Sequence, residues 1–171
     1  VTGTTWFGSS RWVAAAKSPL TGIWGEGDCG GFWGAELKHA GFDALVIKGK
    51  AEKPVYLWIN DGKAEFRGAQ NLWGKGVWDT EDMIREELGD PKVKLASIGP
   101  AGENKVRLAV VQSETENAAG QGGFGAVMGS KNLKAIAVRG TGTVTVAKPK
   151  ELMETSYHIQ KLFSRKPLNS N

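Results

Sequence analysis

Apolar and polar residues alternate over several short stretches of the chain, a pattern that predicts strands more often than helices. The predicted strands span residues 11–16, 44–48, 54–60, 63–67, 92–99, 105–113, 134–140 and 143–147. Residues 44–48 form a continuous apolar run, so a fully buried strand is expected there. Asp61-Gly62 predicts a tight hairpin turn between the third and fourth of these strands.

The predicted helices are short and fall between the strands. They cover residues 31–40, 80–87, a segment ending near Leu133, and 149–164. In the second, Thr80 is the expected N-cap, acidic residues fill the first turn, and Gly89 closes the helix. Many strands with few short helices predict an α+β fold rather than an alternating, doubly wound one.

The order strand, glycine loop, short helix, apolar strand, basic residue, glycine occurs twice, about 91 to 95 residues apart. Arg11 corresponds to Arg107 and Ser18 to Ser113. Gly30-Gly31-Phe32 corresponds to Gly122-Gly123-Phe124, and 44–49 to 135–140. An internal duplication predicts two similar halves related by a pseudo-twofold axis, with their glycine loops near that axis.

Composition narrows the possible classes of protein. The 171 residues are enough for one compact domain or two small ones, and the net charge of +4 comes from scattered basic residues. Nucleic-acid binding would need a clustered basic stripe, so it is not expected. The single cysteine, Cys29, excludes an internal disulfide or a complete iron–sulfur cluster built from this chain. No apolar run is long enough to span a membrane and no signal-peptide pattern opens the chain, so a cytoplasmic location is expected.

The two glycine loops, 25–31 and 118–125, are the candidate binding elements. Free N–H groups at a helix start favour an anion, and glycine lets a phosphate approach the backbone. Structural turns explain the same glycines, and they are the favoured interpretation when the glycine loops are considered alone. Residues 25–30 fit G-x-G-x-x-G, but no acidic residue follows at the distance of a dinucleotide site, so a plain nucleotide-binding module has little support.

Three side chains near the first loop have two interpretations each. Asp28 repels phosphate unless Mg²⁺ bridges them, and it could instead cap the following helix. Cys29 could be a reactive thiol or a small buried residue. Arg11 could contact an anion or lie on the surface. The two histidines, His39 and His158, lack partners at the spacing of metal ligands.

Four long sequence motifs point to a known protein family. Read in order, SPLTG, GGFWGAELKHAGFDALVIKGKAEKPVYLWI, ASIGPAGEN and GAVMGSKNLKAIAVRG resemble the N-terminal domain of the tungsten-dependent aldehyde:ferredoxin oxidoreductase family over nearly all of residues 1–150. The resemblance implies an α+β domain of two similar halves beneath a tungsten atom held by two pterin-dithiolene cofactors, whose phosphates are bridged by Mg²⁺. It also implies a domain at 1–148, incomplete at its N-terminus because the chain begins after the family's first strands. A helical segment, 149–171, is expected to lead toward further domains.

The resemblance assigns roles to individual residues. It implies that Arg11 contacts a cofactor phosphate, and that the Asp28 side chain and the Ala118 carbonyl are ligands of Mg²⁺. The expected cofactor site is completed by the rest of both loops: Cys29, Gly30, Gly31, Asn117, Gly120, Gln121 and Gly122. Where the family usually has Asn-Ser-Gly-Gly, this chain has Asp-Cys-Gly-Gly. Where the family has Arg-Ala-Ala-Gly-Arg-Gly-Gly, neutral Asn117 and Gln121 replace both arginines.

The implied activity is oxidation of aldehydes to carboxylic acids by a tungsten or molybdenum bis-pterin enzyme, with ferredoxin as electron acceptor. The 4Fe-4S cluster and the catalytic residues are expected outside these 171 residues, in the remainder of the enzyme or in a partner subunit. A homo-oligomer or hetero-complex is expected, without nucleic acid or membrane as partner. The alternative, motivated by the two missing arginines, is a non-catalytic subunit for assembly or cofactor handling.

Overall fold

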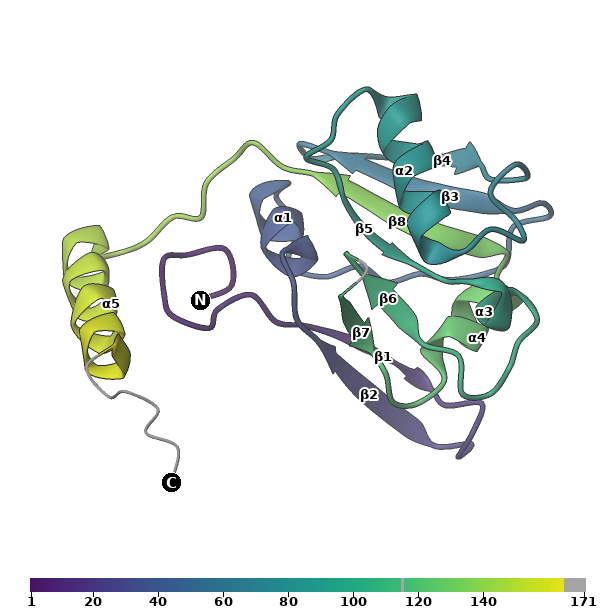
Figure 1. The fold of residues 1–171 in the computed structure, drawn as a ribbon, viewed down its shortest axis with the longest axis horizontal. Coiled ribbons are helices and arrows are strands. Elements are labelled where there is room, and N and C mark those ends of the chain that lie inside the picture. The colour runs from purple at the N-terminus through teal and green to yellow at the C-terminus, as the bar shows by residue number, and fades with distance from the viewer. Residues whose placement is uncertain (115, 165–171) are drawn as a thin grey trace.

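The computed structural model describes residues 1–114 and 116–164. Its strands form a six-stranded sheet in the order β4-β3-β8-β5-β6-β7 and a two-stranded sheet, β1-β2. The strands are β1 (Trp12–Lys17), β2 (Trp24–Cys29), β3 (Val55–Asn60), β4 (Lys63–Gly68), β5 (Lys94–Ser97), β6 (Val111–Ser113), β7 (Asn117–Ala119) and β8 (Leu133–Arg139). The helices are α1 (Trp33–His39), α2 (Val77–Leu88), α3 (Pro100–Glu103), α4 (Phe124–Ser130) and α5 (Pro149–Ser164). Figure 1 shows both sheets in one body, with α5 apart from it at the end of an extended connection.

Strand β8 is the centre of the body because both of its faces are covered. It runs parallel to β3 and antiparallel to β5. Ile136 and Val138 pack into a cluster with residues of α1, α4 and the two-stranded sheet. Ala135 and Ala137 face a second cluster that contains Ile84 of α2. The α+β class is therefore confirmed, and two apolar clusters back to back across one strand hold the body together.

A buried ion pair lies at the beginning of β8. Lys134 Nζ is 2.5 Å from Glu103 Oε1, and the two side chains are 0% and 4% exposed. Lys134 also donates to the Lys75 carbonyl at 2.8 Å, while Glu103 accepts from the Gly74 N–H at 2.8 Å. Burial lowers the pKa of Lys134, and the adjacent carboxylate opposes that shift. The pair ties β8 and α3 to the loop before α2, and no sequence pattern had indicated it.

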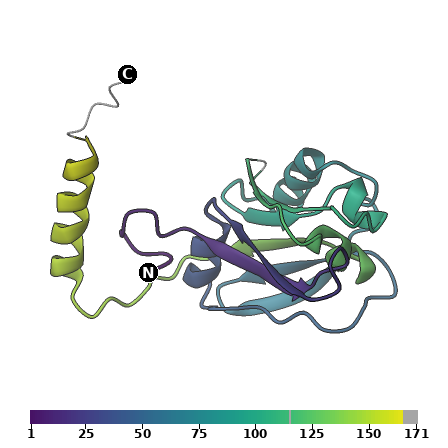
Figure 2. The same ribbon diagram turned by 90° about the horizontal axis from the view of Figure 1, so that it is seen from below.

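The internal duplication appears as a repeated unit of hairpin, helix and extended segment. Strands β1 and β2, then α1, then residues 44–48 form the first copy. Strands β6 and β7, then α4, then β8 form the second. The second strands of the two hairpins, β2 and β7, contact each other. In Figure 2 the β1-β2 hairpin lies across the body on the side turned toward the viewer.

The hairpin of β3 and β4 is confirmed, with Asp61 and Gly62 at φ 42° and 81°. Helix α5 covers the predicted residues 149–164, and the remainder of the predicted helical segment, 165–171, lies outside the described residues. No helix among the described residues is long and apolar enough to cross a membrane. The domain boundary at residue 148 stays a prediction.

Two strand predictions are wrong. Residues 44–48 are extended but pair with no strand in the described part of the chain. Leu45 and Ile47 pack against the core, whereas Val46 is 81% exposed, so the segment is not fully buried. Residues 143–147 also form no strand, because the chain leaves the sheet after β8 and runs toward α5.

The boundaries of several other helices and strands differ from the predicted boundaries for local reasons. The predicted loop after β5 contains helix α3, which begins with proline at its first position. The strand predicted at 105–113 is reduced to β6, since Lys105 adopts φ 58° and the chain turns before Val111. Helix α4 ends at Ser130 rather than near Leu133. Gly89 closes α2 as predicted, at φ 67°.

Helix α2 begins earlier than predicted. Its first residue is Val77 and its N-cap is Gly76, which has extended backbone angles. Thr80 is therefore a residue within the helix. Its buried hydroxyl donates to the Gly76 carbonyl at 2.7 Å, the bond that a threonine makes to the preceding turn.

Candidate cofactor-binding face

The first glycine loop is mostly strand. Residues 25–29 of the predicted loop belong to β2, which pairs with β1 in a regular antiparallel register in which Trp12 lies opposite Cys29. Only the residues from Gly30 to Phe32 connect β2 to α1. Gly27 allows close packing, because a Cβ there would lie 3.3 Å from the Phe124 ring and 3.2 Å from the Gln121 carbonyl oxygen.

Strand alternation brings the predicted phosphate and magnesium residues to one face. Asp28 lies directly opposite Val13, and residues opposite each other in an antiparallel pair point the same way. Both are exposed, as is Arg11, which continues the alternation of β1 by one step. Glu26 lies two residues before Asp28 on β2 and is also exposed. The outer face of the two-stranded sheet therefore carries a guanidinium and two carboxylates.

The opposite face of β2 points into the core. Cys29 is 1% exposed, and burial, followed by the nearby Glu114 carboxylate, raises the pKa of its thiol to about 11. The nearby Arg11 lowers that pKa by a smaller amount. Cys29 is therefore the small buried residue of the two sequence interpretations, and its thiol is protonated at neutral pH. Only its backbone could take part in a site on the outer face.

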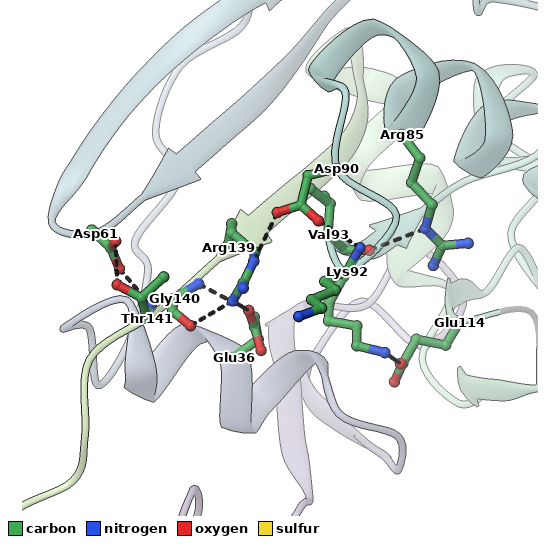
Figure 3. A network of polar contacts seen from close by, with 11 residues as sticks. Glu36, Asp61, Arg85, Asp90, Lys92, Val93, Glu114, Arg139, Gly140 and Thr141 are labelled. Atoms are coloured by element: carbon green, nitrogen blue, oxygen red, sulfur yellow. Dashed lines mark hydrogen bonds and ion pairs between the residues drawn. The ribbon is translucent and has the colours of Figure 1, made fainter.

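Asp28 does not cap α1. The helix begins at Trp33, its N-cap is Phe32, and no side chain caps it. The Phe32 N–H instead donates to the Glu114 carboxylate, which also pairs with Lys94 at 2.8 Å. Glu114 is labelled in Figure 3. A carboxylate from the second half of the duplication thus occupies the start of the first helix, as expected for an anion at that position.

The second loop is more enclosed than the first. Asn117 to Ala119 form β7, in which Ala118 is exposed and Ala119 is buried. Helix α4 begins after Gly123, whose Cβ position is filled by the Arg107 carbonyl. The Gly125 N–H donates to the Ala109 carbonyl at 2.9 Å. Backbone carbonyls therefore cover the start of α4, so these glycines allow close packing.

The remaining residues of the second loop differ in accessibility. Gly120 and Gln121 are exposed, and a Cβ at Gly120 would meet no atom within 4 Å. Gly122 is partly buried beneath the Phe124 ring. The exposed part of this loop is thus the stretch that precedes the helix.

The two loops meet, as the duplication predicted. The Asn117 side-chain oxygen lies 2.6 Å from where a Cβ of Gly30 would be, and its nitrogen lies 3.1 Å from the corresponding position at Gly31. The Gln121 carbonyl lies over Gly27. Asn117, which replaces an arginine of the family, is therefore a contact between the two halves.

No group of three His, Cys, Asp or Glu side chains among the described residues could hold a metal ion by itself. A magnesium ion at Asp28 would need most of its oxygen ligands from elsewhere, such as backbone carbonyls, water and phosphate. This is compatible with the expected ligand set of one side chain and one carbonyl. The predicted pairing of Asp28 with Ala118 stays a prediction.

Sequence reasoning did not find the groups that fix α1. Arg139 at the end of β8 contacts Glu36 of α1 at 2.8 Å and Asp90 at 2.9 Å, and Glu36 also accepts from the Gly140 N–H (Figure 3). The only signal available was the repeated pattern of a basic residue and glycine after the apolar strand. No sequence pattern indicated the contact of Glu114 with the start of α1, because Glu114 lies 82 residues from Phe32.

Comparisons with known proteins agree with this architecture. Residues 1–140 match the profile of the aldehyde ferredoxin oxidoreductase N-terminal domain. A tungsten-containing aldehyde ferredoxin oxidoreductase of Pyrococcus horikoshii is 54% identical over 154 residues, which are 90% of this chain and 25% of that protein. An aliphatic sulfonate oxidoreductase, WOR-like subunit, of Pyrococcus furiosus is 42% identical over 71% of this chain and 21% of its own length.

A solved structure shares the fold closely. The active site complex BamBC of benzoyl coenzyme A reductase, in complex with 1,5-dienoyl-CoA, contains a chain that superposes with a TM-score of 0.94 and 40% identity over 98% of this chain and 26% of its own length. The chain belongs to the aldehyde ferredoxin oxidoreductase family, and the matched part is the N-terminal domain. It spans about a quarter of the length of the curated relatives that it matches.

Proposed function

We propose that this chain is the domain of a tungsten-containing oxidoreductase on which a bis-pterin cofactor rests. The observation that carries the proposal is the outer face of the two-stranded sheet, where Arg11, directly before β1, and Asp28 of β2 are both exposed. Arginine suits a phosphate group and aspartate suits Mg²⁺. Neither group is used by the fold, because neither takes part in an ion pair in the described residues.

Different residues of this chain would bind different parts of such a cofactor. Arg11 would neutralise phosphate, and Asp28 with the Ala118 carbonyl would hold a magnesium ion. Asn117 and Gln121 supply neutral amides where the family has arginines, so less of the phosphate charge is balanced by this domain. When bound, the tungsten cofactor would supply two-electron oxidation of an aldehyde to a carboxylic acid, while this domain would supply binding and orientation.

The remaining parts of the proposed enzyme lie outside this chain. The 4Fe-4S cluster, the catalytic side chains and the ferredoxin contact would come from the rest of the protein or a partner subunit. Relatives that match about 90% of this chain carry aldehyde ferredoxin oxidoreductase in their names, which favours the enzyme over a non-catalytic subunit for assembly or cofactor handling.

The decisive test compares two carboxylates on the same strand of the complete protein. Asp28→Ala removes the proposed magnesium ligand, and the matched control Glu26→Ala removes a carboxylate two residues away on the same face. Loss of a ligand is expected to weaken cofactor retention by at least about tenfold. Tungsten, magnesium and pterin per chain are measured by elemental analysis and pterin fluorescence after desalting.

The two variants give opposite expectations. Asp28→Ala should lose tungsten, magnesium and pterin together, while Glu26→Ala keeps them. Equal contents in both variants would refute the role of Asp28. Absence of both tungsten and molybdenum from an active preparation of the complete protein would refute the proposed function as a whole.

A further inference from the structure

The connection that follows Asp28 contains two successive glycines, Gly30 and Gly31, before α1 begins at Trp33. Gly31 has φ 79°, in the left-handed region. Glycine accepts many backbone conformations, so the residues of this connection do not fix its path by themselves. Contacts from another part of the molecule must hold it.

Side chains from the second half of the duplication supply these contacts. Glu114 Oε2 lies 2.5 Å from the position that a Cβ of Gly31 would take, and it accepts the Phe32 N–H. The Asn117 side-chain oxygen lies 2.6 Å from the corresponding position at Gly30. The space beside both glycines is thus filled by Glu114 and Asn117, which define the path of the backbone.

Glu114 is itself held by Lys94. Glu114 Oε1 lies 2.8 Å from Lys94 Nζ, and the two side chains are 13% and 27% exposed. One carboxylate oxygen therefore contacts the lysine while the other accepts the Phe32 N–H. Lys94 Nζ also lies 5.3 Å from the centre of the Phe32 ring, at the distance of a cation–π contact. These three residues form a closed set of contacts around the start of α1.

The central sheet anchors this set of contacts. Lys94 is the first residue of β5 and pairs with Val138 of β8, the strand covered on both faces. Glu114 directly follows β6 and has φ 51°, a conformation that few residues other than glycine adopt. A side chain presented from such a backbone points to a constraint on its direction.

We propose that Glu114, fixed by Lys94, is a positioning residue for the cofactor-binding face. It holds the connection from Gly30 to Phe32 and thereby fixes the end of β2, where Asp28 lies on the outer face. The inference rests on the proposed function of Asp28 as a magnesium ligand. Glu114 acts through Asp28 and does not itself contact the metal.

Helix α1 does not need Glu114 to stay in place. Trp33 and Leu37 are buried in the apolar core, and Glu36 pairs with Arg139 at 2.8 Å. Loss of Glu114 should therefore loosen the connection before the helix while the helix keeps its packing. Residues that orient a metal ligand without touching the metal typically change metal affinity by about 10–100-fold when they are replaced.

Hydrogen exchange on the complete protein tests the contact with the backbone. In Glu114→Ala the Phe32 amide should exchange at least about tenfold faster, because it loses a hydrogen bond to a charged acceptor. The matched control is Glu116→Ala, which removes an exposed carboxylate two residues further along the chain. Equal exchange of the Phe32 amide in both variants would overturn the inference.

Magnesium-dependent retention of the cofactor tests the positioning role. The complete protein is desalted into buffers of increasing magnesium concentration, and the retained pterin is measured by fluorescence. The concentration that retains half of the pterin should rise about tenfold or more in Glu114→Ala and stay at the wild-type value in Glu116→Ala. Glu114→Gln has the same size and keeps an acceptor for the Phe32 N–H but loses the ion pair with Lys94, so its shift should be smaller and in the same direction. Wild-type retention in both Glu114 variants refutes the inference.

Combination with Asp28→Ala separates this inference from the proposed function. Because Glu114 acts through Asp28, Glu114→Ala should add nothing to the magnesium requirement of Asp28→Ala, whereas independent roles would give additive shifts and contradict the inference. If Asp28→Ala alone leaves retention unchanged, the proposed role of Asp28 fails and this inference fails with it. If Asp28→Ala raises the requirement and Glu114→Ala does not, only the inference fails.

Discussion

The buried pair of Lys134 and Glu103 permits a quantitative prediction, because removal of one partner leaves the other as an unpaired buried charge. Glu103→Gln keeps the size of the side chain and an acceptor for the Gly74 N–H. It leaves the Lys134 ammonium, whose side chain is fully buried, with only the Lys75 carbonyl at 2.8 Å. The carboxylate that opposes the downward shift of the Lys134 pKa is lost, so that pKa falls further.

The expected loss follows from this burial. Breaking a buried pair typically costs about 3–5 kcal/mol of the free energy of unfolding. Exposed pairs contribute about 0–1 kcal/mol. Since whole domains are stable by about 5–15 kcal/mol, Glu103→Gln should remove a large share of the stability of this domain.

Urea unfolding followed by circular dichroism measures the effect. Glu65→Gln is the matched control, because Glu65 pairs with Arg67 on the surface and its side chain is 56% exposed. It should change the free energy of unfolding by less than about 1 kcal/mol. Lys134→Met combined with Glu103→Leu should destabilise less than either single change, because no unpaired charge remains. A loss below about 1 kcal/mol for Glu103→Gln, or strictly additive effects in the double variant, would refute the reasoning.

Two further predictions concern glycine packing and alkaline pH. A Cβ at Gly129 would overlap the Gly102 carbonyl, so Gly129→Ala should lower the free energy of unfolding by about 1–3 kcal/mol, whereas Gly120→Ala, with open space around it, should leave stability unchanged in the same urea assay. Burial raises the pKa of Cys29 from 9.0 to about 11 and that of Tyr56 from 10.0 to about 12. Above pH 9 the unfolded chain releases these protons before the folded chain does, so stability should fall as pH rises, by at most about 1.4 kcal/mol per pH unit for each group. Cys29→Ala should reduce this slope between pH 9 and 11, and an unchanged slope would contradict the assignment.

Much of the fold could be predicted because its signals are local. The hairpin at Asp61-Gly62 depends on two residues that accept positive φ, and α5 has a sustained helical pattern. The two wrong strand predictions share one cause. An apolar run such as 44–48 predicts a strand, but a strand exists only where a neighbour accepts its hydrogen bonds.

The candidate site was partly predictable for the same reason. Strand alternation in β1 and β2 sorts Arg11 and Asp28 to the outer face and Cys29 to the core once the hairpin register is known. The sequence contained the alternation but not the register, because the glycines at 25 and 27 resemble a loop. Glu114 at the start of α1 could not be predicted at all, since that contact joins the two halves of the duplication.

The sequence by itself determined the α+β class, the duplication, the family and the positions of both glycine loops, because each is carried by local pattern or by long motifs. The tertiary structure decided which glycines pack against backbone and which remain accessible, that the Cys29 thiol is buried, and that Lys134 and Glu103 share a buried site. These properties depend on which distant segments meet, and burial, pKa and pairing follow only from that arrangement.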